Sequence, residues 1–306
     1  MTIPTRALGR TGFEVTILGY GAMELRGEPH GPAIDDADAG RLLNELLDAG
    51  INLIDTSVDY GRSEELIGRH VGSRRDEYFL ASKCGCPLSP TPGRTPPYPH
   101  DHSAANVRAG VEQSLRRLRT DRLDLVQVHM SPTRAQMEDD GTIEELQRLR
   151  EEGKVRFLGM SGILPNLAEH ILMDAFDVFQ IPYSALQPEH DELIRRAAQA
   201  GAGVLIRGGA ARGTTSADKA WRPQPIGLSE NVARDRWEAA GLDQLLDGMS
   251  RHEFVLRFTL SHPALSSTIV GTSNLTHLRE NVEIASRGPL ADDLYAEAVH
   301  RLSTTD

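Results

Sequence analysis

The sequence predicts a (β/α)8 barrel of the TIM-barrel class. Short apolar, β-branched runs alternate with amphipathic stretches along the whole chain, and eight such strand-helix units can be counted. Strict alternation of strand and helix implies a parallel sheet, and eight units favour a closed barrel over an open sheet. The length of 306 residues also suffices, since such a barrel needs about 250. We therefore expect a single domain over residues 1–306.

In the first half of the chain, the helices show the clearest spacing. Leu42, Leu43, Leu46 and Leu47 recur at helical intervals, and Gly50 ends that helix. Gly153 stops a later helix in the same way. The predicted elements of this half, strand and helix in turn, are 15–20, 36–49, 51–54, 63–70, 78–82, 104–119, 123–128 and 142–152.

The second half continues the alternation, with one irregular stretch. Its predicted elements, again strand and helix in turn, are 155–160, 166–173, 178–181, 191–200, 203–206, 253–261, 267–270 and 275–284. An open, doubly wound sheet remains the alternative. That fold normally carries a Gly-x-Gly-x-x-Gly turn after its first strand. Gly19 and Gly21 begin such a pattern, but Glu24 stands in the third glycine's place.

Two loops interrupt the pattern, and each follows the carboxyl end of a predicted strand. Residues 87–102 are rich in proline, and residues 208–229 are rich in Gly, Pro, Ser and Thr. Because the carboxyl ends of barrel strands carry the active site, we expect both loops to wall a substrate pocket.

Composition narrows the classes of partner. The formal charge of −11 argues against nucleic acid, because phosphate binding rewards a basic surface. No run approaches the roughly 20 apolar residues that cross a bilayer. The first residues lack the apolar core of a signal peptide, so we expect a cytoplasmic protein without a membrane partner. Cys84 and Cys86 are interpreted as reduced thiols, and two thiols alone make a poor zinc site, so no metal is expected.

Polar side chains collect where three successive predicted strands end. Asp55 ends the second strand and Tyr60 follows it, Lys83 ends the third, and His129 ends the fourth. Each alone has an ordinary structural explanation, such as a capping carboxylate, a rim aromatic, a solvated lysine or a core histidine. Together, a buried lysine and aspartate make sense chiefly as a pair.

The four residues also form a chemically coherent set. A tyrosine is a weak acid, and an adjacent ammonium stabilises its phenolate. Asp55 would fix Lys83, and His129 would donate to a carbonyl oxygen and orient it. Tyr60 would then act as general acid for a carbonyl that receives hydride, or as base for the reverse oxidation. The hydride must come from a cofactor.

In this order and on these strands, Asp55, Tyr60, Lys83 and His129 resemble the catalytic tetrad of the aldo-keto reductases. The resemblance covers nearly the whole chain: 6–12 resembles the family's opening hairpin, 159–161 its strand-five end, and 270–274 with 279–281 its adenosine-phosphate segment. It implies a (β/α)8 barrel that binds NADPH, with NAD possible, and reduces a small-molecule aldehyde or ketone. Monomer is the family's commonest state and the default expectation here.

The resemblance also implies a set of cofactor-binding residues. Ser161 and Gln180 would hold the nicotinamide carboxamide, and Gly271, Thr272 and Ser273 would meet the adenosine 2′-phosphate. The remaining expected cofactor contacts are Gly21, Ala22, Arg207, His277, Glu280 and Asn281.

The sequence departs from the family pattern at three places. Gly162 replaces an asparagine beside nicotinamide, and Arg207 with the glycines after it replaces the segment whose aromatic stacks on nicotinamide. In the phosphate segment, Gly271 and His277 stand where the family has Lys or Arg. We therefore expect a preference for NADPH over NADH that is modest and depends on pH, with Arg279 or Arg207 as second-ranked phosphate ligands.

Two other functions remain open at this stage. Lys83 could serve as the nucleophile of a Schiff-base barrel lyase. Alternatively, the barrel could bind cofactor as a regulatory subunit without useful turnover.

Overall fold

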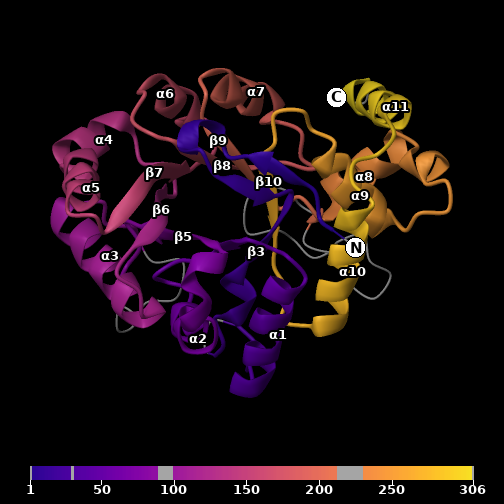
Figure 1. The fold of residues 1–306 in the computed structure, drawn as a ribbon. Coiled ribbons are helices and arrows are strands. Elements are labelled where there is room, and N and C mark those ends of the chain that lie inside the picture. Colours follow the sequence, from indigo (N-terminus) through magenta and orange to yellow (C-terminus); the bar gives the residue numbers. More distant parts are fainter. Residues whose placement is uncertain (1, 29–30, 89–98, 212–229, 305–306) are drawn as a thin grey trace.

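The computed structural model describes residues 2–28, 31–88, 99–211 and 230–304. Eight parallel strands close into a barrel in the order β10-β3-β4-β5-β6-β7-β8-β9, and helices surround it (Figure 1). The closed-barrel prediction is confirmed, and the open doubly wound sheet is wrong. The barrel strands are β3 (Leu18–Gly21), β4 (Leu53–Asp55), β5 (Phe79–Cys84), β6 (Leu123–His129), β7 (Val155–Ser161), β8 (Val178–Pro182), β9 (Gly203–Arg207) and β10 (Ser267–Val270).

The helices begin at side-chain caps in several places. The Asp35 carboxylate accepts from the amides of Ala37 and Asp38, and Ser103, Ser250 and Asn274 cap later helices in the same way. The α-helices are α1 (Asp36–Asp48), α2 (Ser63–His70), α3 (Ala104–Leu118), α4 (Arg134–Asp139), α5 (Thr142–Glu151), α6 (Leu167–Leu172), α7 (Asp191–Gln199), α8 (Glu230–Ala239), α9 (Arg251–Leu260), α10 (Leu275–Ser286) and α11 (Asp292–Ser303).

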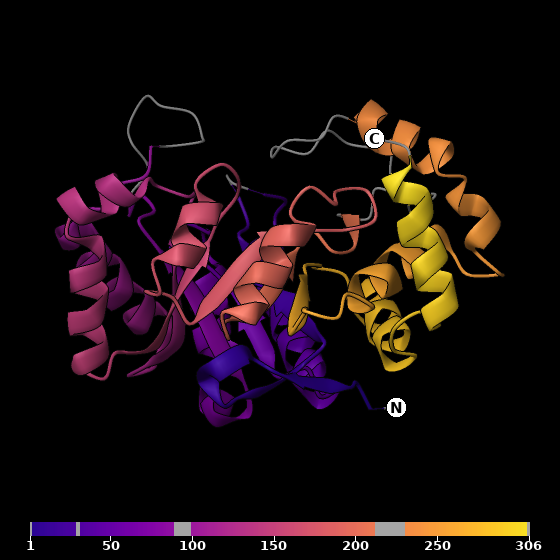
Figure 2. The same ribbon diagram turned by 90° about the horizontal axis from the view of Figure 1, so that it is seen from above.

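Several predicted elements need correction. The single strand predicted over 15–20 is two strands, because β2 (Glu14–Thr16) pairs antiparallel with β1 (Thr5–Ala7) and only β3 enters the barrel. The segment 131–141, which lies between a predicted strand and a predicted helix, contains α4, which Thr133 caps. Helices α8 and α11 were not predicted. They lie outside the barrel on the same side of the molecule (Figure 2).

The β1–β2 hairpin closes the end of the barrel at which the strands begin. Leu8 and Val15 from the hairpin are buried against the inward-facing apolar side chains of the barrel. The Phe13 ring lies edge-on to Phe79 and Phe157, with centroids 5.2 and 5.9 Å away. This closed end is therefore filled, and the other end, where the strands finish, is left for a site.

The two irregular loops lie largely outside the described residues, which exclude 89–98 and 212–229. Within the described part of the chain, no helix has the length and apolar composition needed to cross a membrane.

Candidate active site

The side chains that face the barrel interior are apolar deep in the barrel and polar at its mouth, the end where the strands finish. Side chains of a strand point alternately in and out, so every second residue faces the barrel interior. The deeper inward positions are apolar and include Leu53, Phe79, Ala81, Leu125, Val178 and Leu205. The inward positions nearer the carboxyl ends of the same strands are Asp55, Lys83, Gln127, His129, Gln180 and Arg207. The tetrad candidates on strands thus lie in one layer at the open end.

A buried ion pair stands at the centre of this layer. The Lys83 ammonium donates to Asp55 Oδ2 over 2.6 Å and to the Thr56 carbonyl over 2.7 Å. Both charged residues are 2% exposed. Asp55 Oδ1 accepts two further bonds of 2.8 Å, from the side-chain amides of Gln127 and Gln180. Oδ2 therefore holds Lys83, while the two glutamine amides fix the carboxylate through Oδ1.

Lys83 remains an ammonium in this setting. Burial by itself lowers the pKa of Lys83, because it removes the charge from water. The charge and hydrogen bond of Asp55, together with Tyr60 and Asp59, outweigh this effect, and the net pKa lies above the ordinary lysine value.

Tyr60 lies in the loop after β4, directly over this pair. The Lys83 Nζ atom is 4.9 Å from the centroid of the Tyr60 ring. Burial raises the pKa of Tyr60 above its ordinary value, the Lys83 charge lowers it, and Asp55 adds to the rise. From the sequence, only the lowering by Lys83 is expected. Burial outweighs that effect, so Tyr60 is a protonated phenol at neutral pH.

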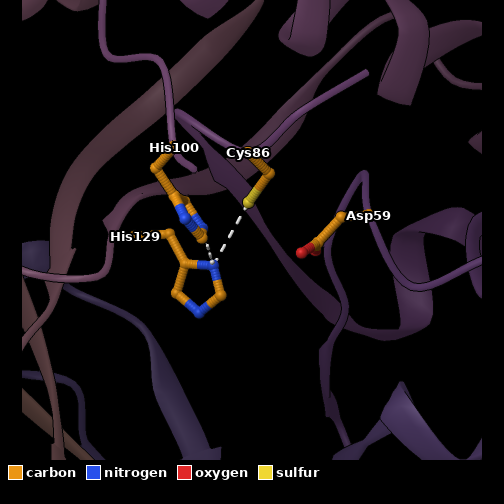
Figure 3. Close-up of side chains that lie close together, drawn as sticks. All are labelled: Asp59, Cys86, His100 and His129. Atoms are coloured by element: carbon orange, nitrogen blue, oxygen red, sulfur yellow. Dashed lines mark hydrogen bonds between the residues drawn. The ribbon is translucent and has the colours of Figure 1, made fainter. Parts of the chain in front are cut away.

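His129 ends β6 and faces the same mouth. Burial lowers its pKa well below the ordinary value, and the charge of Lys83 lowers it further. The ring is therefore neutral near pH 7 and can donate or accept. Its Nδ1 atom lies 3.2 Å from Cys86 Sγ and 3.3 Å from His100 Nε2, and Figure 3 shows the other ring nitrogen turned away from both.

Ser161 and Gln180 lie beside the tetrad and bond to each other. Ser161 pairs in register with His129 on one side and with Gln180 on the other. The Ser161 hydroxyl donates to Gln180 Oε1 over 3.1 Å. Gly21 pairs with Asp55 across β3 and β4, and the next residue, Ala22, is buried.

Glycine at 271 is required by a close approach of two strand ends. A Cβ atom on Gly271 would lie 2.6 Å from the Gly21 carbonyl oxygen, which is backbone and cannot swing aside. The Thr272 carbonyl accepts from the buried Tyr20 hydroxyl over 2.7 Å, which anchors the segment. Gly21 and Gly271 thus form a surface without side chains next to Asp55.

The other residues expected to bind adenosine phosphate are more dispersed. Ser273, His277 and Glu280 are exposed, whereas Asn281 is buried and bonded to His252. The amides of Thr276 and His277 already donate to the Asn274 side chain, so the start of α10 offers fewer free amides than the sequence suggested.

The two second-ranked arginines have different surroundings. Arg279 forms a bidentate ion pair with Glu45 of α1, at 2.5 and 2.9 Å, so its guanidinium already has a carboxylate partner. Arg207 lies near enough to His129 for its charge to lower the pKa of that ring.

Sequence reasoning missed four residues of this layer and its rim: Gln127, Cys86, His100 and Asp59. Gln127 had a usable signal, because it lies two residues before His129 on one strand and must share its face. The other three depend on how the loops after β4 and β5 fold.

Comparison with known proteins agrees with this geometry. The model of the Aldo/keto reductase family matches residues 17–300. An uncharacterized oxidoreductase, YqkF of Bacillus subtilis, is 28% identical over 94% of this chain and 93% of its own length. L-galactose dehydrogenase of Arabidopsis thaliana is 30% identical over 92% of this chain and 87% of its own. The structure of aldo-keto reductase AKR11C1 from Bacillus halodurans, in its holo form, superposes with a TM-score of 0.83 at 29% identity and covers 98% of this chain and 96% of that one. The chain belongs to the aldo/keto reductase family and is an NAD(P)H-dependent oxidoreductase.

Proposed function

We propose that the protein reduces an aldehyde or ketone to an alcohol with NADPH, reversibly, and that Tyr60 is the general acid. The observation that carries this proposal is the buried Asp55–Lys83 ion pair beneath Tyr60. A phenol alone is a poor acid at neutral pH. A fixed ammonium 4.9 Å from the ring centroid stabilises the negative charge that develops on Tyr60 as its proton leaves.

The residues fit a nicotinamide cofactor. The surface formed by Gly21 and Gly271 lets an extended molecule approach the backbone beside Asp55, where a Cβ on Gly271 could not fit. Ser161 and Gln180 offer a hydroxyl and an amide at hydrogen-bonding positions for a carboxamide. The adenosine phosphate end would meet Thr272, Ser273 and His277, with Glu280 and Asn281 beside the adenine. When bound, the reduced cofactor supplies a hydride.

The side chains of the chain would then perform the remaining tasks. His129, neutral and at the mouth, donates to the carbonyl oxygen and orients it. Tyr60 Oη delivers a proton to that oxygen as negative charge develops there. Lys83 stabilises the resulting phenolate, and Asp55 keeps Lys83 charged and fixed.

The phosphate segment supports NADPH over NADH by a modest margin. A 2′-phosphate is best held by a fixed Arg or Lys. Arg279 is engaged by Glu45, and the exposed His277 stands at the start of α10. A single exposed histidine holds a phosphate less firmly than a fixed guanidinium or ammonium, so the margin should be modest.

The lyase alternative receives less support. A Schiff-base lysine must lose its proton to attack a carbonyl. The pKa of Lys83 is raised, and its ammonium is committed to Asp55 and the Thr56 carbonyl.

The test is an assay of NADPH oxidation by the full chain over aromatic and aliphatic aldehydes and ketones, with borohydride trapping in parallel. We expect carbonyl-dependent oxidation that consumes one NADPH per alcohol formed, and no trapped adduct on Lys83. Cofactor binding without oxidation across the panel would favour the regulatory alternative, and a trapped Lys83 adduct would favour the lyase.

A further inference from the structure

Four side chains with metal-ligating atoms converge beside His129. They are Asp59 after β4, Cys86 after β5, His100, and His129 at the end of β6 (Figure 3). One ligand atom from each lies within 4.8 Å of all the others. They come from the loops after β4 and β5 and from the end of β6, so the convergence is a property of the fold and not of a local sequence motif.

The distances between these ligand atoms resemble those around a tetrahedral zinc ion. Zinc bonds of about 2.0–2.1 Å to nitrogen and about 2.3 Å to sulfur place ligand atoms about 3.3–3.6 Å apart. His100 Nε2 lies 3.3 Å from His129 Nδ1, and Cys86 Sγ lies 3.2 Å from the same atom. All four ligand atoms lie within 4.8 Å of one another, a limit about 1.2–1.5 Å above the tetrahedral edge, and side-chain rotation can close this difference.

The surrounding backbone is held without any ion. Asn106 of α3 donates to the carbonyls of Cys86 and Asp101, and the Asp101 amide donates to the Gly85 carbonyl. The His102 ring bonds to the His129 carbonyl over 2.8 Å, which ties the segment that bears His100 to β6. Ser57 bonds to both Asp59 and Cys86. The segments that bear the four ligands are therefore linked to one another by hydrogen bonds, as metal sites require of their outer shell.

We propose that Asp59, Cys86, His100 and His129 bind a single zinc ion. The ligand set of one thiol, two imidazoles and one carboxylate suits Zn²⁺ and disfavours Mg²⁺ and Ca²⁺, which prefer oxygen ligands. A thiolate and a carboxylate also neutralise a divalent charge. A metal on Nδ1 of His129 requires the ring proton on Nε2, the nitrogen that faces away from the cluster.

This inference goes beyond the proposed function and does not depend on it, because the experiment measures metal binding and not enzymatic turnover. The two imidazoles and the thiol could instead form a hydrogen-bonded chain without metal. The experiment distinguishes these two arrangements.

The experiment titrates the full chain, stripped with chelator, with Co²⁺ as a spectroscopic probe and then displaces it with Zn²⁺. We expect one Co²⁺ per chain, with visible bands of tetrahedral cobalt and a near-ultraviolet thiolate-to-cobalt band, all removed by Zn²⁺. Cys86→Ser should abolish the thiolate band, and His100→Ala should weaken binding by about 10- to 100-fold.

Matched controls are Cys84→Ser, which removes the other thiol, and His300→Ala, which removes a remote surface imidazole on α11; both should bind as wild type does. Circular dichroism of each variant shows whether it has folded. Absence of the thiolate band in the wild-type chain, or equal affinity in folded Cys86→Ser or His100→Ala, would overturn the proposal in favour of the metal-free hydrogen-bonded chain.

Discussion

The Gln180 side-chain amide donates to Asp55 Oδ1 over 2.8 Å. The other carboxylate oxygen of Asp55 accepts from Lys83, so Gln180 is hydrogen-bonded directly to the ion pair beneath Tyr60. Gln180 is also the residue proposed to meet the nicotinamide carboxamide. One hydrogen-bonded network therefore positions both the cofactor contact and the proton donor.

Replacing Gln180 with Met should affect both cofactor affinity and rate. It removes a bond to a charged acceptor, worth about 1.5–3 kcal/mol, and a proposed carboxamide contact. Gln127→Met is the matched control, because Gln127 donates to the same Asp55 oxygen but has no proposed cofactor contact. We expect the NADPH Kd, measured by fluorescence titration, to rise about tenfold or more only in Gln180→Met, with kcat lowered in both. Equal NADPH affinities in the two variants would contradict the assignment of Gln180.

Lys83→Met should slow reduction and move its pH profile. The Lys83 charge lowers the pKa of Tyr60, whose net pKa is nevertheless raised by burial. Reduction needs the protonated phenol, so its rate should be level near neutrality and fall only as pH rises through the pKa of Tyr60. Without Lys83 that pKa rises further, and the alkaline fall should shift to higher pH.

The rate of Lys83→Met should also be lower throughout the pH range, because the phenolate loses its stabilising charge. Loss of a buried partner costs about 3–5 kcal/mol, so unfolding midpoints should be recorded alongside. Lys154→Met, which removes a half-buried lysine paired with Glu112 and Glu152, should keep the wild-type profile. An unchanged profile in folded Lys83→Met would refute the electrostatic role.

Gly271→Ala should weaken cofactor binding and destabilise the chain. The new methyl would lie 2.6 Å from the Gly21 carbonyl oxygen, so β3 and β10 must move apart, at a cost of about 1–3 kcal/mol. Gly72→Ala is the control, because its Cβ would have no neighbour nearer than 3.7 Å. Thermal unfolding and NADPH titration should separate the two variants. If Gly271→Ala matched Gly72→Ala in both unfolding temperature and NADPH affinity, the close approach of Gly271 to Gly21 would not matter for binding.

Cofactor preference should respond to His277 and not to Arg279. His277→Arg should widen the ratio of NADPH to NADH efficiency at both pH 6 and pH 8, because a guanidinium is charged and can bind a phosphate through two hydrogen bonds. His277→Ala should narrow the ratio. Arg279→Ala should leave it nearly unchanged, since Glu45 already holds that side chain. Comparison of kcat/KM for both cofactors at the two pH values is the measurement, and an NADH preference at both would overturn the phosphate-site assignment.

Most helices and strands were predictable, because the alternation of apolar runs with amphipathic stretches and the helical spacing of leucines depend only on residues near one another in the sequence. The ranges predicted for three strands from apolar runs, 123–128, 155–160 and 203–206, stop one residue short of the polar residues that end them, His129, Ser161 and Arg207. Those residues continue the strand because barrel pairing extends to the mouth. The strand predicted over 15–20 was split because it serves both the closing hairpin and the barrel, a division that only tertiary pairing determines.

The polar mouth was partly predictable for the same reason. Asp55, Lys83 and His129 stand at strand ends, which parallel pairing brings together. The rise in the pKa of Tyr60 was not foreseen, because burial of a loop residue depends on packing and not on neighbours in sequence. The approach of His100 to His129 depends likewise on the path of the loop after β5.

The most direct test of the proton-donor assignment measures the rate of hydride transfer in Tyr60→Phe. The rate is recorded in a single turnover by stopped-flow, as the loss of NADPH absorbance. Tyr78→Phe is the control, since Tyr78 is a remote buried tyrosine whose hydroxyl donates to the Val71 carbonyl. We predict that Tyr60→Phe slows this step by about 10²–10⁴-fold with NADPH affinity nearly unchanged, and that Tyr78→Phe matches wild type. A Tyr60→Phe rate above about half that of wild type would contradict the assignment of Tyr60 as the acid, because a lost general acid costs far more.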